Sequence, residues 1–248
     1  MPGLKVYEPL ASTVKVPFSS TLGALAGVAF AFFFFGSVWI AEPLGQATDQ
    51  ELLAWWSDSG KLRETFISMY FLVLAAPLFL VFLVHLCNRL RSAGQNAESW
   101  TGLVFGAGVA FSALLAVTAI SRGVLAQSIR LSDEPIPGPD TLRYATELSG
   151  ALFGMGAIPF AAITVAIASA IVVQTGVLAR WLGWLGFVVA ALTLALVVLL
   201  IGAFAIPLIT LWVAAASFVM WRSRHAVAGD TLAQRSGGSL ASSAPASR

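Results

Sequence analysis

Six long apolar segments constrain this chain of 248 residues more than any other feature. The hydrocarbon core of a bilayer is about 30 Å thick, and a helix needs about 20 mainly apolar residues to cross it. The sequence therefore predicts an all-α, polytopic transmembrane bundle with six spans. The spans are expected near Ser19–Ala41, Thr65–Asn88, Trp100–Ser121, Ala145–Gln174, Arg180–Ile201 and Phe204–Trp221.

Charged residues are sorted between the two sides of this expected bundle. If the N-terminus is cytoplasmic, that side holds three acidic residues and nine basic ones, Lys5, Lys15, Arg89, Arg91, Arg180, Arg222, Arg224, Arg235 and Arg248. The external side holds nine acidic residues and five basic ones, Lys61, Arg63, Arg122, Arg130 and Arg143. Because Lys and Arg are enriched in cytoplasmic loops, both termini are expected to be cytoplasmic, in a multi-pass protein of the cytoplasmic membrane.

The composition supports the same class. Hydrophobic residues make up 58% of the chain and charged residues 10%, whereas soluble domains carry about 25% charged residues. The formal charge of +2 reflects a basic surplus at the membrane edge, so membrane lipids rather than nucleic acid are the expected partners. A single cysteine, Cys87, excludes an intramolecular disulfide.

Three regions follow from this pattern. Residues 1–17 are expected to form a cytoplasmic leader, and residues 18–224 the six-helix transmembrane domain. The first apolar segment is longer than the roughly 7 to 15 apolar residues of a cleavable signal, so it predicts an uncleaved signal anchor. Residues 225–248 are rich in Ser, Ala and Gly and predict a disordered cytoplasmic tail.

The two longer external connections carry local signals. Thr48 to Glu51 fits a capping box, and the apolar residues after it predict a short helix in the outer head-group region. This segment is either a tether with an aromatic anchor or a lid over an outer cavity. Prolines in the second external loop, Gly123–Tyr144, predict an extended segment that ends at an N-cap, Asp140 or Thr141.

Chemistry-bearing groups are scarce within the spans. No Asp, Glu, Lys or Arg lies near the centre of an expected span, and the motifs of hydrolases, metalloproteases and nucleotide-binding proteins are missing from the sequence. His85 is the single histidine within a span, too few for a zinc or haem site. We therefore expect no catalytic residue, no metal and no cofactor, in a protein that is not an enzyme.

Ionisable groups near the external ends of the spans form the candidate site. Arg63 precedes Tyr70 by two turns on the second span, Arg122 ends the third, and Glu147 lies about one turn into the fourth. If these spans are neighbours, the groups gather at the outer mouth of the bundle. They would then either line a pocket for an amphiphile, with Arg63 or Arg122 on its anionic head, or pair only to fix the helix ends.

A second set of arginines is expected at the cytoplasmic membrane edge, where basic side chains set topology and contact anionic lipid head groups. Its members are Arg89, Arg91, Arg180, Arg222 and Arg224. Glycines at packing spacing predict close contacts between helices of the same chain. They include Gly23 with Gly27, Gly102 with Gly106, Gly150 with Gly154, and Gly183 with Gly186.

Two stretches resemble a known family. The first runs from Trp56 to Arg63 (WSDSGKLR), followed by Tyr70-Phe71, and the second is TGVLARWLGWLG, residues 175–186. They are similar to a large family of uncharacterised polytopic membrane proteins common in actinobacteria, and the resemblance spans most of the chain. It implies six helices and a cytoplasmic-membrane location. It implies no established activity, so it transfers no catalytic residue.

Three functions stay open at this point. The first is a non-enzymatic membrane protein that binds a lipid or small amphiphile at an outward-facing pocket, or serves as an accessory subunit of a membrane complex. The second is a small-molecule transporter, for which Pro77 and Pro159 would kink facing helices around a cavity. The third is an intramembrane enzyme, with Glu147 and Tyr70 as its available pair. A protein partner in the membrane and a homo-oligomer also stay open.

Overall fold

The computed structural model describes residues 20–37, 47–131 and 136–222, and every regular element in these ranges is a helix. The predicted all-α class is therefore confirmed for this part of the chain. The expected leader, residues 1–17, and the expected tail, residues 225–248, lie outside the described residues.

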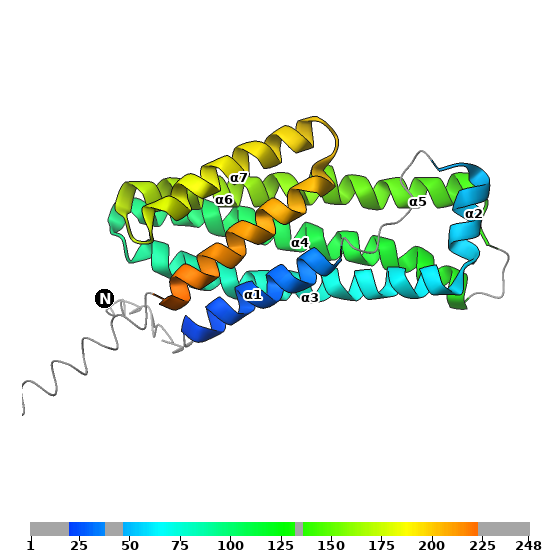
Figure 1. Ribbon diagram of the computed structural model, residues 1–248, viewed down its shortest axis with the longest axis horizontal. Helices are drawn as coiled ribbons and strands as arrows, with labels where there is room; N and C mark the ends of the chain where they lie inside the picture. The colour runs from blue at the N-terminus through cyan, green and yellow to red at the C-terminus, as the bar shows by residue number, and fades with distance from the viewer. Residues whose placement is uncertain (1–19, 38–46, 132–135, 223–248) are drawn as a thin grey trace, which may run out of the picture.

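The helices in chain order are α1 (Ser20–Gly36), α2 (Asp49–Ser57), α3 (Ser59–Arg91), α4 (Gln95–Leu131), α5 (Pro139–Ala151), α6 (Ile158–Thr175) and α7 (Arg180–Val198). A π-helical turn, η1 (Leu152–Ala157), joins α5 directly to α6. A 3₁₀ turn, η2 (Gly202–Ala205), opens the last helix, Gly202–Arg222. Figure 1 shows that α3, α4 and the continuous α5–α6 run the length of the molecule, whereas α1, α7 and the last helix cover only part of it.

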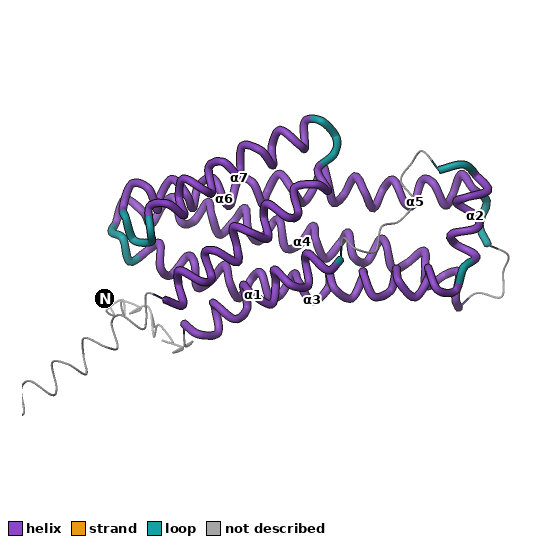
Figure 2. Tube along the Cα trace, in the orientation of Figure 1, coloured by secondary structure: helices purple, strands orange, loops and turns teal. Residues whose placement is uncertain are grey.

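The two ends of the bundle differ in charge. At one end α3 ends and α7 begins; this basic end carries Arg89, Arg91, Arg180 and Arg222. At the opposite end, the α2 end, helix α2 lies across the long helices (Figures 1 and 2). Its described charged residues are six acidic ones, Asp49, Glu51, Asp58, Glu64, Asp140 and Glu147, and five basic ones, Lys61, Arg63, Arg122, Arg130 and Arg143. The charge separation in the sequence therefore runs along the long axis of the bundle.

Five helices are long and apolar enough to cross a membrane: Ser59–Arg91, Ala97–Leu131, Pro139–Thr175, Arg180–Val198 and Gly202–Arg222. Thr21–Gly36 is a shorter apolar helix, and it packs along α3. These helices indicate a membrane-embedded protein. Each of the last five predicted spans corresponds to one of the long helices, while the first span and the six-span topology stay predictions.

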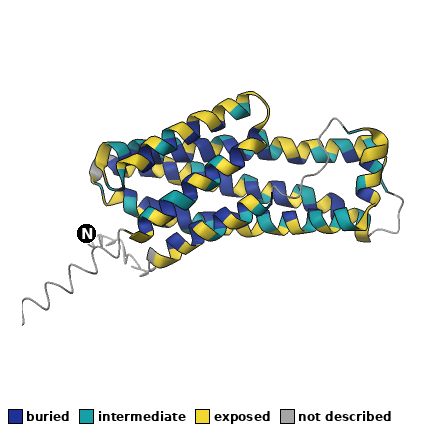
Figure 3. Ribbon diagram, in the orientation of Figure 1, coloured by how far each residue is buried: buried dark blue, intermediate teal, exposed yellow. Residues whose placement is uncertain are grey.

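The exposed surface of the bundle is apolar, as contact with lipid requires. Phe32 is 67% exposed and Val198 79% exposed, and Figure 3 shows exposed positions along the outside of α1 and α7. Exposed tryptophans stand on helix ends at the basic end: Trp100, Trp181, Trp184 and Trp221. Tryptophan is enriched at the level of lipid head groups, so this placement is typical of a bilayer boundary.

The helices extend beyond the predicted spans. α3 has 33 residues and α4 has 37, which makes them about 50 and 55 Å long at 1.5 Å per residue. These lengths exceed the hydrocarbon core by about 20 Å. The predicted external loop Gly123–Tyr144 is wrong, because the chain is helical to Leu131 and again from Pro139. The ends of these helices are polar and contain no apolar run. A hydropathy pattern therefore predicts the apolar part of each helix and not its polar ends.

A second, smaller hydrophobic core explains why these helices continue. It lies at the α2 end and contains five buried residues, Leu52, Trp56, Leu125, Ala126 and Leu142. They come from α2, from the end of α4 and from the start of α5. We call these residues and the helix ends that carry them the head. Burial of apolar surface in the head stabilises these polar helix ends.

The predicted capping box and short helix at Thr48–Glu51 are confirmed. The backbone N–H of Thr48 donates to Glu51 Oε2 at 2.8 Å, and the backbone N–H of Glu51 donates to Thr48 Oγ1 at 3.3 Å. The backbone hydrogen bond, followed by the one from the Thr48 hydroxyl, lowers the pKa of Glu51. The location of α2 in the head-group region stays a prediction.

The predicted N-cap of the fourth span is wrong. Helix α5 begins at Pro139, and its N-cap is Gly138, which has no side chain to form a capping hydrogen bond. Proline suits the first helical position, because its φ is preset and its missing N–H would have no partner there. Asp140 and Thr141 therefore lie inside the first turn, two and three residues past the cap.

Phenylalanine rings fill the space between α1, α3 and α4. Phe30, Phe34, Phe79 and Phe111 are each at most 3% exposed. The ring centroids of Phe79 and Phe111 lie 4.8 Å apart, and those of Phe30 and Phe34 lie 5.0 Å apart. Aromatic pairs at such distances pack densely, so the core of these three helices is solid.

Glycines allow close helix packing at both positions of two of the four predicted pairs, Gly23 with Gly27 and Gly183 with Gly186. A Cβ on Gly27 of α1 would meet Ser217 of the last helix and would lie 2.6 Å from a ring carbon of Phe82. Other glycines whose Cβ would meet a neighbouring helix are Gly23, Gly183 and Gly186. A Cβ on Gly102 or Gly106 would meet nothing within 4 Å, so this pair does not pack within the described chain.

Gly27→Val is expected to lower the free energy of unfolding by about 1 to 3 kcal/mol, because the added atoms must displace Phe82 and Ser217. The matched control is Gly106→Val, the same change on an outward face of α4. It is expected to be neutral or slightly stabilising, because glycine is the poorer helix former. Thermal unfolding of both variants in the same detergent measures the difference. Equal melting temperatures would contradict the packing of α1.

Candidate functional site

No hydrogen bond or ion pair joins the four residues of the predicted external cluster, Arg63, Tyr70, Arg122 and Glu147. Arg63 and Tyr70 are both exposed, Tyr70 by 58%. They lie two turns apart on the outer face of α3, whereas Thr65 and Ser68 on its inner face are buried. The structure therefore does not bring Arg63 and Tyr70 together with the groups on α4. Their assignment as ligand-binding residues stays a prediction.

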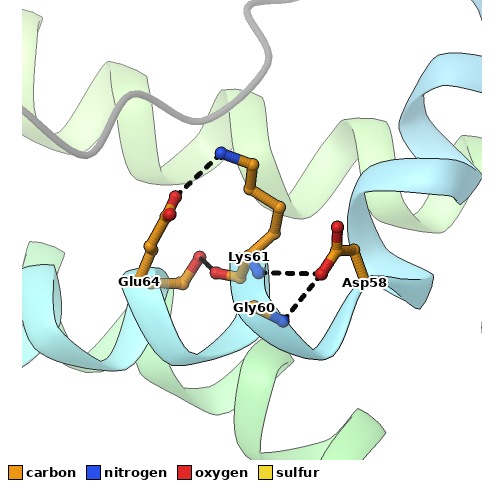
Figure 4. Close-up of polar contacts among 5 residues, drawn as sticks. Asp58, Gly60, Lys61 and Glu64 are labelled. Atoms are coloured by element: carbon orange, nitrogen blue, oxygen red, sulfur yellow. Dashed lines mark hydrogen bonds and ion pairs between the residues drawn. The ribbon is translucent and has the colours of Figure 1, made fainter.

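The start of α3 has its own local contacts, which Figure 4 shows. Asp58 Oδ1 accepts hydrogen bonds from the backbone N–H groups of Gly60 and Lys61, at 2.7 and 3.3 Å. Lys61 Nζ donates to Glu64 Oε2 at 2.9 Å. The same ammonium group lies 4.7 Å from the centre of the Trp55 ring. Glu64 thus pairs with a neighbour on its own helix.

Arg122 takes part in a hydrogen-bonded chain across three helices. Its Nη1 donates to Ser68 Oγ of α3 at 3.0 Å, and Ser68 Oγ donates to the backbone oxygen of Ser37 at 3.0 Å. Ser68 is 1% exposed and Ser37 4% exposed. Ser37 directly follows α1, where the last carbonyl groups lack helical partners and a positive charge is favourable. We call this chain the Arg122 tie, and it joins α4, α3 and α1.

Glu147 lies apart from the Arg122 tie. It is exposed on α5 and makes no hydrogen bond or ion pair with any residue that the structure describes. One turn earlier on the same helix, Arg143 Nη2 donates to Asp49 Oδ1 of α2 at 2.8 Å. Arg143 is therefore paired with Asp49 of α2, while the Glu147 side chain is exposed.

A groove lies on the side of the bundle that α5 and η1 share with the end of α7. It has a volume of about 150 Å³ and a mainly apolar lining. The lining residues are Gly150, Ala151, Gly154, Met155, Val197, Leu200 and Gly202. Leu200 belongs to the connection between α7 and the last helix, and Gly202 is the first residue of the last helix. The groove therefore lies between α5–η1 and the turn from α7 into the last helix.

Backbone features at the groove are unusual. A Cβ on Gly202 would lie 2.8 Å from the carbonyl oxygen of Gly154, so the two segments approach at their backbones. Leu200 has a φ of 60°, which is rare for a residue other than glycine. η1 is a six-residue π-helical turn, an element found mostly as single turns and frequently at functional sites.

The groove lies about one bilayer thickness from the basic end. From Gly154 to Thr175, at the end of α6, the helix rises about 32 Å at 1.5 Å per residue. Helix α7 has 19 residues, and it covers a similar height of about 28 Å. If the tryptophans mark one bilayer boundary, the groove lies at the other boundary, at the level of the lipid head groups.

The α2 helix does not cover this groove. Helix α2 packs against α3 and α5, and its Asp49 pairs with Arg143. Arg143 is seven residues from Gly150, or about 10 Å along the helix axis. α2 is therefore part of the head, and the geometry does not favour the alternative that it is a lid over an outer cavity.

The arginines of the predicted cytoplasmic set gather at the basic end. Arg89 is half-buried, and Arg91, Arg180 and Arg222 are exposed. Arg224 lies outside the described residues. The exposed arginines stand beside the exposed tryptophans of the same helix ends, an arrangement typical of a membrane boundary. Their contact with lipid head groups stays a prediction.

The remaining candidates for chemistry do not gather into one site among the described residues. His85 Nδ1 lies 2.8 Å from the backbone oxygen of Val81, and a Cβ on Gly23 would meet its imidazole. Among the described residues, no three His, Cys, Asp or Glu side chains gather to hold a metal ion. Pro77 is exposed on α3, and α4 packs between α3 and α6, so Pro77 and Pro159 do not face one another.

Comparison with known proteins adds no family. The chain matches no protein-family model, and neither a similar curated protein nor a similar solved structure was found. The resemblance to the actinobacterial membrane proteins therefore stays a prediction. The class that the fold itself defines is a membrane-embedded helical bundle.

Ser68→Ala is expected to lower the free energy of unfolding by about 1 to 3 kcal/mol, because it leaves buried hydrogen-bonding groups of the Arg122 tie without their partner. Ser128→Ala is the control. Ser128 is an exposed serine of α4 that bonds only to its own helix, and its loss should change stability by less than about 0.5 kcal/mol. Thermal unfolding compares the two. An unchanged melting temperature for Ser68→Ala would show that the tie does not hold the helices.

Proposed function

We propose that this protein is a non-enzymatic membrane protein that binds a lipid or small amphiphile in the groove between η1 and the end of α7. The observation that carries the proposal is the groove itself, which is apolar, opens to the outside of the bundle and is lined by glycine backbone. An acyl chain can lie closely against such a surface, since glycines have no side chain to keep it away.

The proposal includes a topology. The protein lies in the cytoplasmic membrane with six spans, its basic end and both termini in the cytoplasm, and α2 at the outer surface. The arginines and tryptophans of the basic end support this orientation. The groove then opens at the boundary between the outer leaflet and the external solution, where an amphiphile can enter sideways from lipid.

An accessory subunit is the second candidate function, and the head favours it. The head projects about 20 Å beyond the hydrocarbon core, and it carries charged and aromatic side chains that a partner outside the membrane can contact. A protein recovered in constant proportion with the chain after gentle extraction would favour this role.

Gly150→Leu tests the groove. Gly150 lines the groove, and a Cβ there meets nothing within 4 Å, so leucine fills the space without a clash. With a dodecyl maltoside probe that carries a diazirine on its chain, we expect light-induced labelling of residues 150–155 and 197–202. Gly150→Leu should reduce it about fivefold, which corresponds to roughly 1 kcal/mol of lost dispersion contacts.

The matched control for the groove is Gly102→Leu, an equally open glycine on an outward face of α4. It should leave the labelling of residues 150–155 unchanged, because it is not among the residues that line the groove. Labelling spread evenly over all exposed apolar faces would overturn the proposed function, since the groove would then be ordinary lipid-facing surface.

Single cysteines test the topology. In a Cys87→Ser background, we expect a membrane-impermeant maleimide to label Ser57→Cys on intact cells and to label Ser92→Cys only after permeabilisation. Both serines are exposed and lie near opposite ends of α3. An N-terminal epitope should behave like Ser92→Cys if α1 crosses the membrane. The reverse pattern at the two cysteines would show that the basic end is external.

A further inference from the structure

The groove has a charged residue in line with it on one wall. Glu147 precedes Gly150, Ala151 and Gly154 by three, four and seven residues. Residues at these spacings lie on one face of a helix. Glu147 is exposed, and it lies about 10 Å beyond Gly154 along the helix axis, toward the α2 end. The carboxylate therefore lies at the mouth of the groove.

An apolar groove in contact with lipid cannot select its occupant by hydrophobicity. Lipid tails are as apolar as the lining of the groove, so transfer of an acyl chain from one to the other gains only packing. Selectivity for one amphiphile must then come from its polar head. The side chains at the mouth decide which head is favourable.

The charge at this mouth is negative. Among the described residues, Glu147 has no hydrogen-bonding or ionic partner, and the nearest cation on the same helix, Arg143, is paired with Asp49. The opposite wall, residues 197–204, contains no ionisable side chain. Arg122 of α4 donates to Ser68 of α3.

We propose that the groove takes an amphiphile with an ammonium head, whose positive charge lies against Glu147 while its chain lies along Gly150 and Gly154. This inference rests on the proposed function, and it specifies the class of ligand. The sequence instead predicted an amphiphile whose anionic head binds Arg63 or Arg122. Neither arginine borders the groove.

Three probes with the same diazirine-bearing dodecyl chain test the inference, one with a trimethylammonium head, one with a maltoside head and one with a sulfate head. Each is added in trace amounts to the full chain in dodecyl maltoside micelles. Labelling of residues 150–155 and 197–202 should be about three- to fivefold stronger with trimethylammonium than with maltoside, as expected for an exposed charge pair. It should be weakest with sulfate.

Glu147→Gln should remove this preference without changing labelling by the maltoside probe, and Glu147→Lys should make sulfate the strongest probe. Asp140→Asn is the matched control, because Asp140 is an exposed acid two turns earlier on the same helix. It should retain the preference for trimethylammonium.

The outcomes separate the two proposals. Equal labelling of the groove by all three heads overturns the ammonium inference and leaves the amphiphile groove standing. A preference that survives Glu147→Gln, or that Asp140→Asn removes equally, also overturns it, because the cause is then the general charge of the α2 end. Failure of every probe to label the groove refutes the proposed function and, with it, this inference.

Discussion

The difference between helix length and bilayer thickness determines how this molecule is divided. α3, α4 and the continuous α5–α6 are 33 to 37 residues long, whereas about 20 residues cross the hydrocarbon core. α7, with 19 residues, and the last helix, with 21, fit that thickness. The excess length of the three long helices has to be stabilised outside lipid, and the second hydrophobic core around Trp56 and Leu142 provides this. The head is formed by α2 and by the ends of the three long helices, which extend beyond the ends of α1, α7 and the last helix.

The same difference in length positions the groove. Where α7 stops and the chain turns back, α5 continues toward the head, so the turn packs against the side of the longer helix α5–α6. Gly202 and Gly154 allow the two backbones to touch at this point. The groove is the space that remains beside this contact, at the level where the shorter helices end.

The sequence was sufficient for features that depend on local composition. Five apolar segments predicted the five long helices, and Thr48 with Glu51 predicted the cap of α2. Helix ends such as residues 123–131 could not be predicted, because their stability comes from contacts with α2 and α5 far along the chain. The start of α5 at Pro139 was predictable in principle, since proline favours the first helical position. The prolines of the preceding loop were interpreted as an extended segment, so Pro139 was not recognised as the first residue of a helix.

The candidate site shows where reasoning from the sequence stops. Proximity to span ends suggested Arg63, Tyr70, Arg122 and Glu147 as one cluster, yet a helix sends residues of similar height to different faces. The inward residue, Arg122, is engaged with Ser68 and thereby with the end of α1, and its charge serves helix packing. Tyr70 faces outward, and Glu147 lies at the mouth of a groove whose π-helical turn has no signature in the sequence. A charged group at a membrane boundary can select a ligand only if its charge is not already paired within the fold. Glu147 and Arg63 both meet that criterion, since both are exposed, but only Glu147 is in line with residues that border the groove. Glu147 is therefore the group that we expect to select the head of an amphiphile.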